Sequence, residues 1–168
     1  MKVIFLDVDG VLNNDKTRSR TPTGWLGVST TLVNKLKRII SETGAVTVLS
    51  STWKHSDKPD LDYLYSKLGK KATPIDRTYD PDDRDSRRGA GINDYIKNHQ
   101  DVSEFVILDD YSFDFREQNL LPHTVLTQEH IGLTDDDVSM AIDILNGKLL
   151  AEDYYKEKFM EWGYHHAW

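Results

Sequence analysis

The chain has 168 residues, of which 38% are hydrophobic and 29% are charged, which is typical of one soluble globular domain with a core of its own. It contains no cysteine, which excludes disulfides, thiol catalysis and zinc–thiolate sites and is compatible with the cytoplasmic location that we expect. The net charge of −7 argues against a protein that coats nucleic acid by charge alone, and no apolar run is long enough to cross a membrane.

The first predicted element is a buried, parallel β-strand over residues 3–6, because this apolar run is short and stops abruptly. It is followed by Asp7-Val8-Asp9-Gly10, so that two carboxylates stand on alternate residues at the strand end. Carboxylates crowded at such a place repel each other and cost desolvation energy. They therefore indicate a bound cation or catalytic work; the alternative is that they only cap the next turn.

Residues 11–28 have no sustained hydrophobic period and are predicted to form a loop or a small hairpin beside this strand end. We expect Trp25 to pack and to hold this segment against the protein, because aromatic side chains mostly serve burial. The alternative is that its indole faces a substrate.

A βαβ unit is completed by the next two predicted elements. The helix should start at Ser29 or Thr30 and end at Gly44, with its apolar side chains on one face. A second buried strand should then cover residues 45–49 and end in the polar run SSTWK at residues 50–54. Strand, helix and strand at this spacing predict a right-handed crossover.

The middle of the chain is less regular. A short helix is predicted over residues 61–68, and a weak strand over residues 72–75, which its proline places at a sheet edge. Residues 76–88 are rich in charge and turn formers and are predicted to be an exposed loop. The next helix should begin near Gly89 or Gly91.

Two further strands and two helices are predicted in the last part of the chain. The strands cover residues 104–108, which two aspartates follow, and residues 124–127. Thr134 should begin a helix, and the acidic residues 135–137 indicate capping of that helix rather than a metal site. An aromatic helix over residues 149–168 is expected to dock on the core.

These elements predict an α/β fold, a Rossmann-like three-layer sandwich around a central, mainly parallel five-stranded sheet. A single domain should span residues 1–168, with its core in residues 1–147. Because parallel strands end along one edge of their sheet, polar residues far apart in the sequence should meet there. These residues are Asp7, Asp9, Ser50, Ser51, Arg88, Asp109 and Asp110.

This set of carboxylates, hydroxyls and a guanidinium favours the binding of a phosphate together with a metal ion. Carboxylate oxygens suit Mg²⁺, which prefers one or two carboxylates plus a substrate phosphate. A hydroxyl and a guanidinium can then hold phosphoryl oxygens. We therefore expect Mg²⁺ as the cofactor and a phosphorylated compound as the substrate.

At four places the sequence resembles motifs of the haloacid dehalogenase (HAD) superfamily of phosphohydrolases, in the same order and with similar spacing. Residues 5–12 (FLDVDGVL) resemble its first motif and residues 48–51 (VLSS) its second. Residues 88–89 (RG) match the position of the basic third motif, which is usually Lys. Residues 107–110 (ILDD) resemble the acidic fourth motif.

A more specific resemblance is to the HAD domains of Swiss-army-knife RNA-repair proteins. The features that carry it are SSTWK at residues 50–54, RG at residues 88–89 before a helix, and GLT at residues 132–134. The segments in which the superfamily inserts cap domains, residues 11–28 and 76–88, are short in this chain. The resemblance thus implies a minimal cap or none, and a site that is open to a large substrate.

The resemblance also implies a role for each site residue. Asp7 would be the nucleophile, and Asp9 the general acid and base. Ser50, which directly follows the apolar strand, fits the second motif better than Ser51, and Arg88 would bind the phosphate. The implied metal ligands are Asp7, Asp9 through its backbone carbonyl, Asp109 and Asp110, with Asp114 as a further acidic candidate. The residues implied at the substrate are Gly10, Ser51, Lys54 and Arg87, the last being an alternative to Arg88.

The function implied is Mg²⁺-dependent hydrolysis of a phosphomonoester through an aspartyl-phosphate. The expected substrate is a nucleotide or the phosphorylated end of RNA or DNA, because basic residues flank the motifs. These residues are Lys16, Arg18, Arg20, Arg84 and Arg87. The alternatives are a phosphatase for small non-nucleotide molecules and a catalytically silent phosphate-binding module, either HAD-like or receiver-like.

Overall fold

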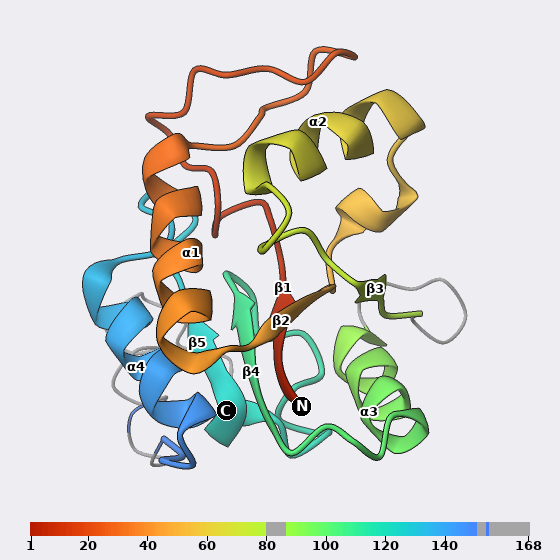
Figure 1. The fold of residues 1–168 in the computed structure, drawn as a ribbon, viewed down its shortest axis with the longest axis vertical. Coiled ribbons are helices and arrows are strands. Elements are labelled where there is room, and N and C mark those ends of the chain that lie inside the picture. Colours follow the sequence, from red (N-terminus) through yellow and green to blue (C-terminus); the bar gives the residue numbers. More distant parts are fainter. Residues whose placement is uncertain (80–86, 151–153, 155–168) are drawn as a thin grey trace.

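A computed structural model of the protein describes residues 1–79, 87–150 and 154. Five strands form one sheet in the order β3-β2-β1-β4-β5, and every neighbouring pair is parallel (Figure 1). In chain order the elements are β1 (Lys2–Leu6), α1 (Thr30–Thr43), β2 (Val46–Leu49), the 3₁₀ turn η1 (Thr52–His55), α2 (Lys58–Leu68), β3 (Asp76–Arg77), α3 (Arg88–Asn98), β4 (Glu104–Asp109), the 3₁₀ turn η4 (Leu121–His123), β5 (Thr124–Leu126) and α4 (Asp135–Leu145). The predicted α/β fold around a parallel five-stranded sheet is confirmed. Among the described residues, no helix has the length and apolar character needed to cross a membrane.

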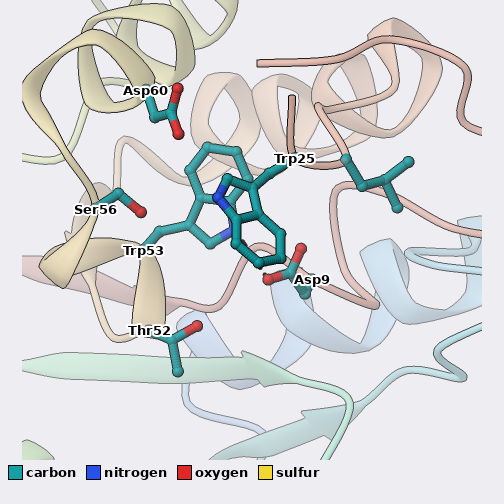
Figure 2. Close-up of a pocket in the computed structure, with 7 residues that line it drawn as sticks. Asp9, Trp25, Thr52, Trp53, Ser56 and Asp60 are labelled. Atoms are coloured by element: carbon teal, nitrogen blue, oxygen red, sulfur yellow. Dashed lines mark hydrogen bonds between the residues drawn. The ribbon is translucent and has the colours of Figure 1, made fainter. Parts of the chain in front are cut away.

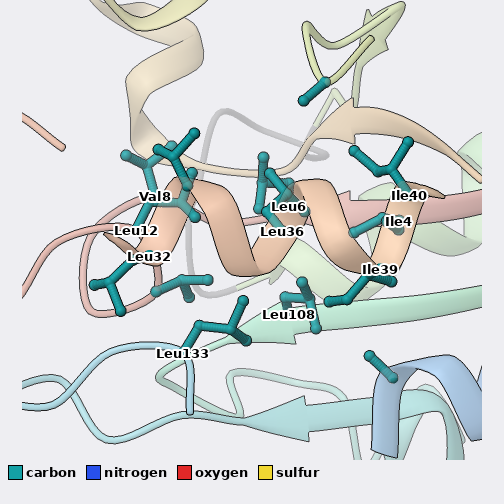
Figure 3. Close-up of a cluster of buried hydrophobic side chains, with 14 of the residues drawn as sticks. Ile4, Leu6, Val8, Leu12, Leu32, Leu36, Ile39, Ile40, Leu108 and Leu133 are labelled. Carbon is teal, nitrogen blue, oxygen red and sulfur yellow. The ribbon is translucent and has the colours of Figure 1, made fainter. Parts of the chain in front are cut away.

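Helices cover both faces of the sheet, which gives three layers. One buried cluster joins α1, α2 and α4 to the first face, and a second joins α3 and the segment 111–123 to the other face. Alternate residues of β1 point to the two layers, Ile4 and Leu6 to the first and Val3 and Phe5 to the second. Figure 3 shows the apolar side of α1 lying along the first face. Burial on both sides explains why β1 is a continuous apolar run.

The register of the three central strands sets their ends level with one another. Leu6 of β1 pairs with Leu49 of β2 on one side and with Leu108 of β4 on the other. The ladder continues one step further, because the amide of Asp7 donates to the Leu108 carbonyl at 2.9 Å and that of Ser50 to the Leu6 carbonyl at 2.9 Å. The residues that follow these strands therefore start from the same edge of the sheet.

The start of α4 confirms that its acidic residues cap a helix. The Thr134 hydroxyl accepts from the Asp137 amide at 3.1 Å, while the Thr134 amide donates to the Asp137 carboxylate at 2.9 Å. This reciprocal pair is a capping box, which satisfies two backbone donors of the first turn. At the end of α1, Gly44 takes the left-handed conformation that was expected of a helix-ending glycine, with φ of 70°.

The third predicted strand is misplaced, whereas the start of α3 lies close to its predicted position. The third strand does not cover residues 72–75 but consists of Asp76 and Arg77, inside the segment that was predicted to be a loop. Both residues are exposed and lie at the sheet edge, so no apolar run marks them. α3 starts one residue earlier than expected, at Arg88. The predicted helix over residues 149–168 falls almost entirely outside the described residues.

Candidate active site

Asp7 and Asp109 lie at the carboxyl ends of the neighbouring strands β1 and β4, and both are buried. Arg88, the first residue of α3, lies between them. Its Nη1 is 2.6 Å from Asp109 Oδ2 and 3.3 Å from Asp7 Oδ2. A cation at the amino end of a helix opposes the helix dipole. The two carboxylates therefore determine the position of this guanidinium.

The charges in this buried group depend on one another. Burial raises the pKa of Asp7 and raises that of Asp109 well above its ordinary value, although the Arg88 guanidinium acts in the opposite direction on both. Burial alone would lower the pKa of Arg88, but Asp109 and then Asp7 outweigh it, so that the pKa lies above its ordinary value. Arg88 thus stays protonated, and two carboxylates share one positive charge.

One hydrogen-bond donor of Arg88, its Nε, is available to a ligand. Its guanidinium lies over the Phe113 ring, 4.1 Å from the ring centroid, which is a cation–π contact. Within the described part of the chain, its Nε is buried and has no hydrogen-bond partner. A buried donor of this kind is costly unless a ligand accepts from it. The site therefore favours an anion beside Arg88.

Asp110 adds a third carboxylate next to Gly10. Burial, followed by the charge of Asp7, raises the pKa of Asp110 from its ordinary 3.8 to about 6. A Cβ built on Gly10 would overlap the Asp110 carboxylate, and the backbone of Gly10 has φ of 66°. Only glycine therefore fits this turn without displacing Asp110. The Gly10 carbonyl accepts from the Thr127 hydroxyl at 2.7 Å.

Asp7, Asp109 and Asp110 meet the requirements of a divalent cation. Each offers one carboxylate oxygen, and these three oxygens lie within 4.8 Å of one another. All are hard oxygen donors, which suits Mg²⁺. Burial and neighbouring negative charge raise the pKa values of the three groups. A bound cation would stabilise their charged forms and so offset both effects. The donor set therefore fits a Mg²⁺ ion held by these three side chains.

This arrangement predicts how metal binding depends on pH. With its pKa raised to about 6, Asp110 binds a proton more tightly in the folded than in the unfolded protein, so the metal-free protein loses stability as pH rises from 3.8 to about 6. A metal ion must displace that proton at low pH. We expect Mg²⁺ to raise the unfolding temperature more at pH 7.5 than at pH 5, measured by calorimetry. An equal rise at both pH values, or the same rise in Asp110→Asn, would contradict the assignment.

Asp9 lies apart from these three carboxylates and has its own partners. Its Oδ2 accepts from the Trp53 indole at 2.9 Å, and its Oδ1 accepts from the side-chain amide of Asn13 at 2.6 Å. The Asn13 side chain in turn accepts from the Gly10 amide at 3.0 Å. These bonds hold an otherwise exposed carboxylate in one orientation. No spacing in the sequence links Trp53 to Asp9, because the two residues are 44 positions apart along the chain.

The two serines at the end of β2 face different partners. The Ser51 side chain forms a hydrogen bond with Asp7, which acts to lower the pKa of that carboxyl, and it also accepts from the Trp53 amide at 3.3 Å. The Ser50 hydroxyl instead accepts from the Thr78 hydroxyl at 3.4 Å. The preference for Ser50 as the serine that binds phosphate stays a prediction, while in the structure Ser51 is the serine next to the Asp7 carboxylate. Successive residues leaving a strand point to opposite faces, so an error of one residue reverses the assignment.

The remaining predicted site residues lie around this centre. Lys54 is buried in η1, where its carbonyl accepts from Arg77 at 2.9 Å. Arg87 is exposed and precedes α3. Asp114 accepts from the amides of Gly89 at 2.6 Å and Ala90 at 3.1 Å. It therefore caps α3 from outside the helix, and it does not belong to the metal-ligating group of the described residues.

Trp25 corrects another expectation, since its side chain does not pack into the core and is 73% exposed. It lines a cavity of about 420 Å³ next to Asp9. Figure 2 shows the indoles of Trp25 and Trp53 between the carboxylates of Asp9 and Asp60. The full lining consists of Asp9, Trp25, Leu26, Thr52, Trp53, Ser56 and Asp60. The alternative interpretation, in which Trp25 faces a ligand, is the one that this geometry favours.

Comparison with known proteins agrees with the geometry of the site. A family model described as the HAD domain in Swiss Army Knife RNA repair proteins matches residues 3–138. Apart from Lys2, the first residue of β1, this match covers all five strands and all the strand-end residues described above. Searches of curated proteins and of solved structures found no match. The chain therefore belongs to the HAD superfamily, in the family of HAD domains found in Swiss Army Knife RNA repair proteins.

Proposed function

We propose that the protein is a Mg²⁺-dependent phosphomonoester hydrolase in which Asp7 is the nucleophile. The observation that carries the proposal is the meeting of Asp7, Asp109 and Asp110 around one point, with the Arg88 guanidinium beside them. This group combines a nucleophilic oxygen, donors for a cation and a fixed positive charge in a buried place. Phosphoryl transfer needs these elements, because an anionic nucleophile must approach an anionic ester.

In the first step, a carboxylate oxygen of Asp7 attacks phosphorus in line, and the bond from phosphorus to the leaving oxygen breaks. Asp9 donates a proton to that oxygen. In the second step, Asp9 takes a proton from a water molecule that attacks the aspartyl-phosphate, which releases inorganic phosphate and restores Asp7. The hydrogen bonds from Trp53 and Asn13 hold Asp9 in place for both transfers.

Arg88 and Ser51 support the same steps. The free Nε of Arg88 can donate to a phosphoryl oxygen, while Nη1 continues to hold the two carboxylates. The Ser51 hydroxyl orients the Asp7 carboxylate. A bound Mg²⁺, held by Asp7, Asp109 and Asp110, supplies Lewis-acid stabilisation of the charge on the phosphoryl group. The backbone carbonyl of Asp9 is a further proposed ligand.

We propose a nucleotide or a nucleic-acid end as the substrate class. The family to which the chain belongs is named for RNA repair, which supports this class. Exposed basic residues also lie on the segment 11–28 and before α3; they are Lys16, Arg18, Arg20 and Arg87. Arg84, the other predicted contributor, lies outside the described residues. These charges could attract a polyanion although the protein is acidic overall.

The test is a panel of phosphate esters assayed with Mg²⁺, comprising a 3′-phosphorylated oligonucleotide, mononucleotides and a sugar phosphate. We expect kcat/KM to be highest for the oligonucleotide, and this advantage to shrink as salt rises, because each phosphate contact releases counterions. A preference for the sugar phosphate that salt does not change would assign the protein to small-molecule phosphatases instead. No turnover of any ester would support a silent phosphate-binding module.

A further inference from the structure

None of the three clustered carboxylates lines the cavity beside Asp9, and of its lining residues only Asp9 and Trp53 have a role in the chemistry proposed so far. Its walls come from the segment 11–28, which contributes Trp25, and from η1 and α2, which contribute Trp53 and Asp60. Its volume of about 420 Å³ lies within the range of small-molecule sites. Its lining combines two indoles and Leu26 with four polar residues, which are Asp9, Thr52, Ser56 and Asp60.

The exposure of Trp25 does not result from a loose loop. Its amide donates to the Thr21 hydroxyl at 3.1 Å, and its carbonyl accepts from the Thr21 amide at 3.0 Å. The neighbouring residues 20 and 26 form an antiparallel bridge. Thr23 then joins the segment to α2, because its amide donates to Asp60 at 3.2 Å and its hydroxyl donates to the same carboxylate. The indole is therefore held in solvent, at a hydrophobic cost that a flat ligand would recover.

Asp60 determines what this ligand can be. Burial favours its neutral form, but the hydrogen bonds from Thr23 and Thr21 outweigh burial, so that the pKa of Asp60 lies below its ordinary value. Its carboxylate is therefore anionic and opposes a phosphate in this part of the cavity. A carboxylate can accept about four hydrogen bonds, so Thr23 and Thr21 do not occupy every acceptor position of Asp60. The cavity thus favours a flat group that carries N–H donors and no negative charge.

The position of Asp9 relates this group to the reaction. Asp9 lines the cavity and, in the proposed mechanism, protonates the leaving oxygen. The part of the substrate that lies next to Asp9 is then the leaving group and not the transferred phosphoryl group. A nucleoside meets this description, because its base is flat and carries N–H donors and its ribose carries the hydroxyl that is released.

We propose that this cavity binds the nucleobase of the nucleotide that carries the scissile phosphate, stacked on the Trp25 indole with its N–H groups toward Asp60. This inference rests on the proposed function and extends it to the recognition of the substrate. Stacking of a base on an aromatic side chain is tolerant of sequence, because every base has a π-face. The site would therefore require a base without selecting strongly which one.

The kinetic test compares esters that differ only in the base. Adenosine 3′- and 5′-monophosphates are assayed beside the corresponding methyl ribofuranoside phosphates, which have no base. We expect a kcat/KM advantage of about tenfold or more for the better nucleotide, on the scale of one stacked base. Trp25→Ala should reduce that advantage to about twofold or less, mainly through KM, and Trp25→Phe should restore most of it. Equal kcat/KM for both kinds of ester, or an advantage unchanged in Trp25→Ala, would overturn the proposal.

A binding test separates this inference from the proposed function. Saturation-transfer NMR detects the base protons of adenosine, which has no phosphate, in the presence of metal-free protein. We expect a signal with the wild type and with Trp25→Phe, and its loss with Trp25→Ala. If this pattern appears while no ester is hydrolysed, the proposed activity fails and the base site stands. If esters are hydrolysed while adenosine gives no signal that depends on Trp25, the base site fails and the activity stands.

Discussion

Asp7→Asn should lower phosphatase turnover by at least about 10³-fold, because an amide oxygen cannot act as the nucleophile that forms the acyl-phosphate. The fold should survive, since the substitution keeps the size of the side chain and removes one of two like charges that share Arg88. Metal-free stability should not fall, because burial already raises the pKa of Asp7. Single-turnover assays with Mg²⁺, together with urea unfolding, measure both effects.

The matched control for this prediction is Asp62→Asn. Asp62 is an exposed aspartate of α2, paired with Lys58 four residues away, and the same chemical change there should alter neither turnover nor stability by much. If Asp7→Asn hydrolysed its substrates at the rate of the control, another group would have to attack phosphorus. The proposed mechanism would then be wrong even though the metal site could remain.

Arg88→Met should destabilise the metal-free protein by about 3–5 kcal/mol at pH 7.5, because it leaves two buried carboxylates without their counter-charge. The side chain has low exposure and bridges Asp7 and Asp109, so that solvent cannot replace it. Turnover should also fall, by about 10²-fold or more, if its guanidinium stabilises the phosphoryl group as proposed. Urea unfolding at pH 7.5 and pH 5, with kcat measured beside it, tests both parts.

The dependence on pH distinguishes lost charge from lost packing. At pH 5 the carboxylates bind protons more readily, since burial raises the pKa of both, so Arg88→Met should cost less there than at pH 7.5. Arg88→Lys should retain part of the stability by keeping a charge. Arg38→Met, at an exposed arginine paired with Glu42, provides the control. A loss that is equal at both pH values would mean that packing against Phe113 dominates.

Much of the fold could be predicted because its signals are strong and local. The apolar runs of β1, β2 and β4 have polar residues directly after them, and a parallel sheet brings those residues to one edge. The third strand was misplaced for a physical reason. Two exposed residues at a sheet edge, Asp76 and Arg77, are held by backbone pairing to β2 and leave no hydrophobic pattern in the sequence.

The details of the site were less predictable, because they depend on side-chain directions and on contacts between distant segments. Ser51 rather than Ser50 contacts Asp7, a difference that the alternation along a strand decides and that composition does not. The bond between Trp53 and Asp9 joins two loops that no spacing rule connects. Trp25 was expected to be buried as most aromatics are, whereas its hydrogen-bonded segment holds it in solvent.

The central strands β1, β2 and β4 end in register, whereas the segment 11–28 lies outside the sheet. These two parts of the molecule should differ in how readily they tolerate substitutions. The Asp7 amide is bonded to the Leu108 carbonyl, so the edge that carries the proposed catalytic residues is part of the central strands. Core strands of this kind typically open only when the whole domain unfolds. The segment 11–28 is anchored at its two ends by the core residues Val11, Leu12 and Val28, while its middle, which carries Trp25, contacts α2 through the hydrogen bonds from Thr23 to Asp60. If the proposed function holds, substitutions near Trp25 can alter which leaving group is accepted without disturbing the strands that carry the proposed catalytic residues. Chemistry and recognition can therefore evolve separately in this protein.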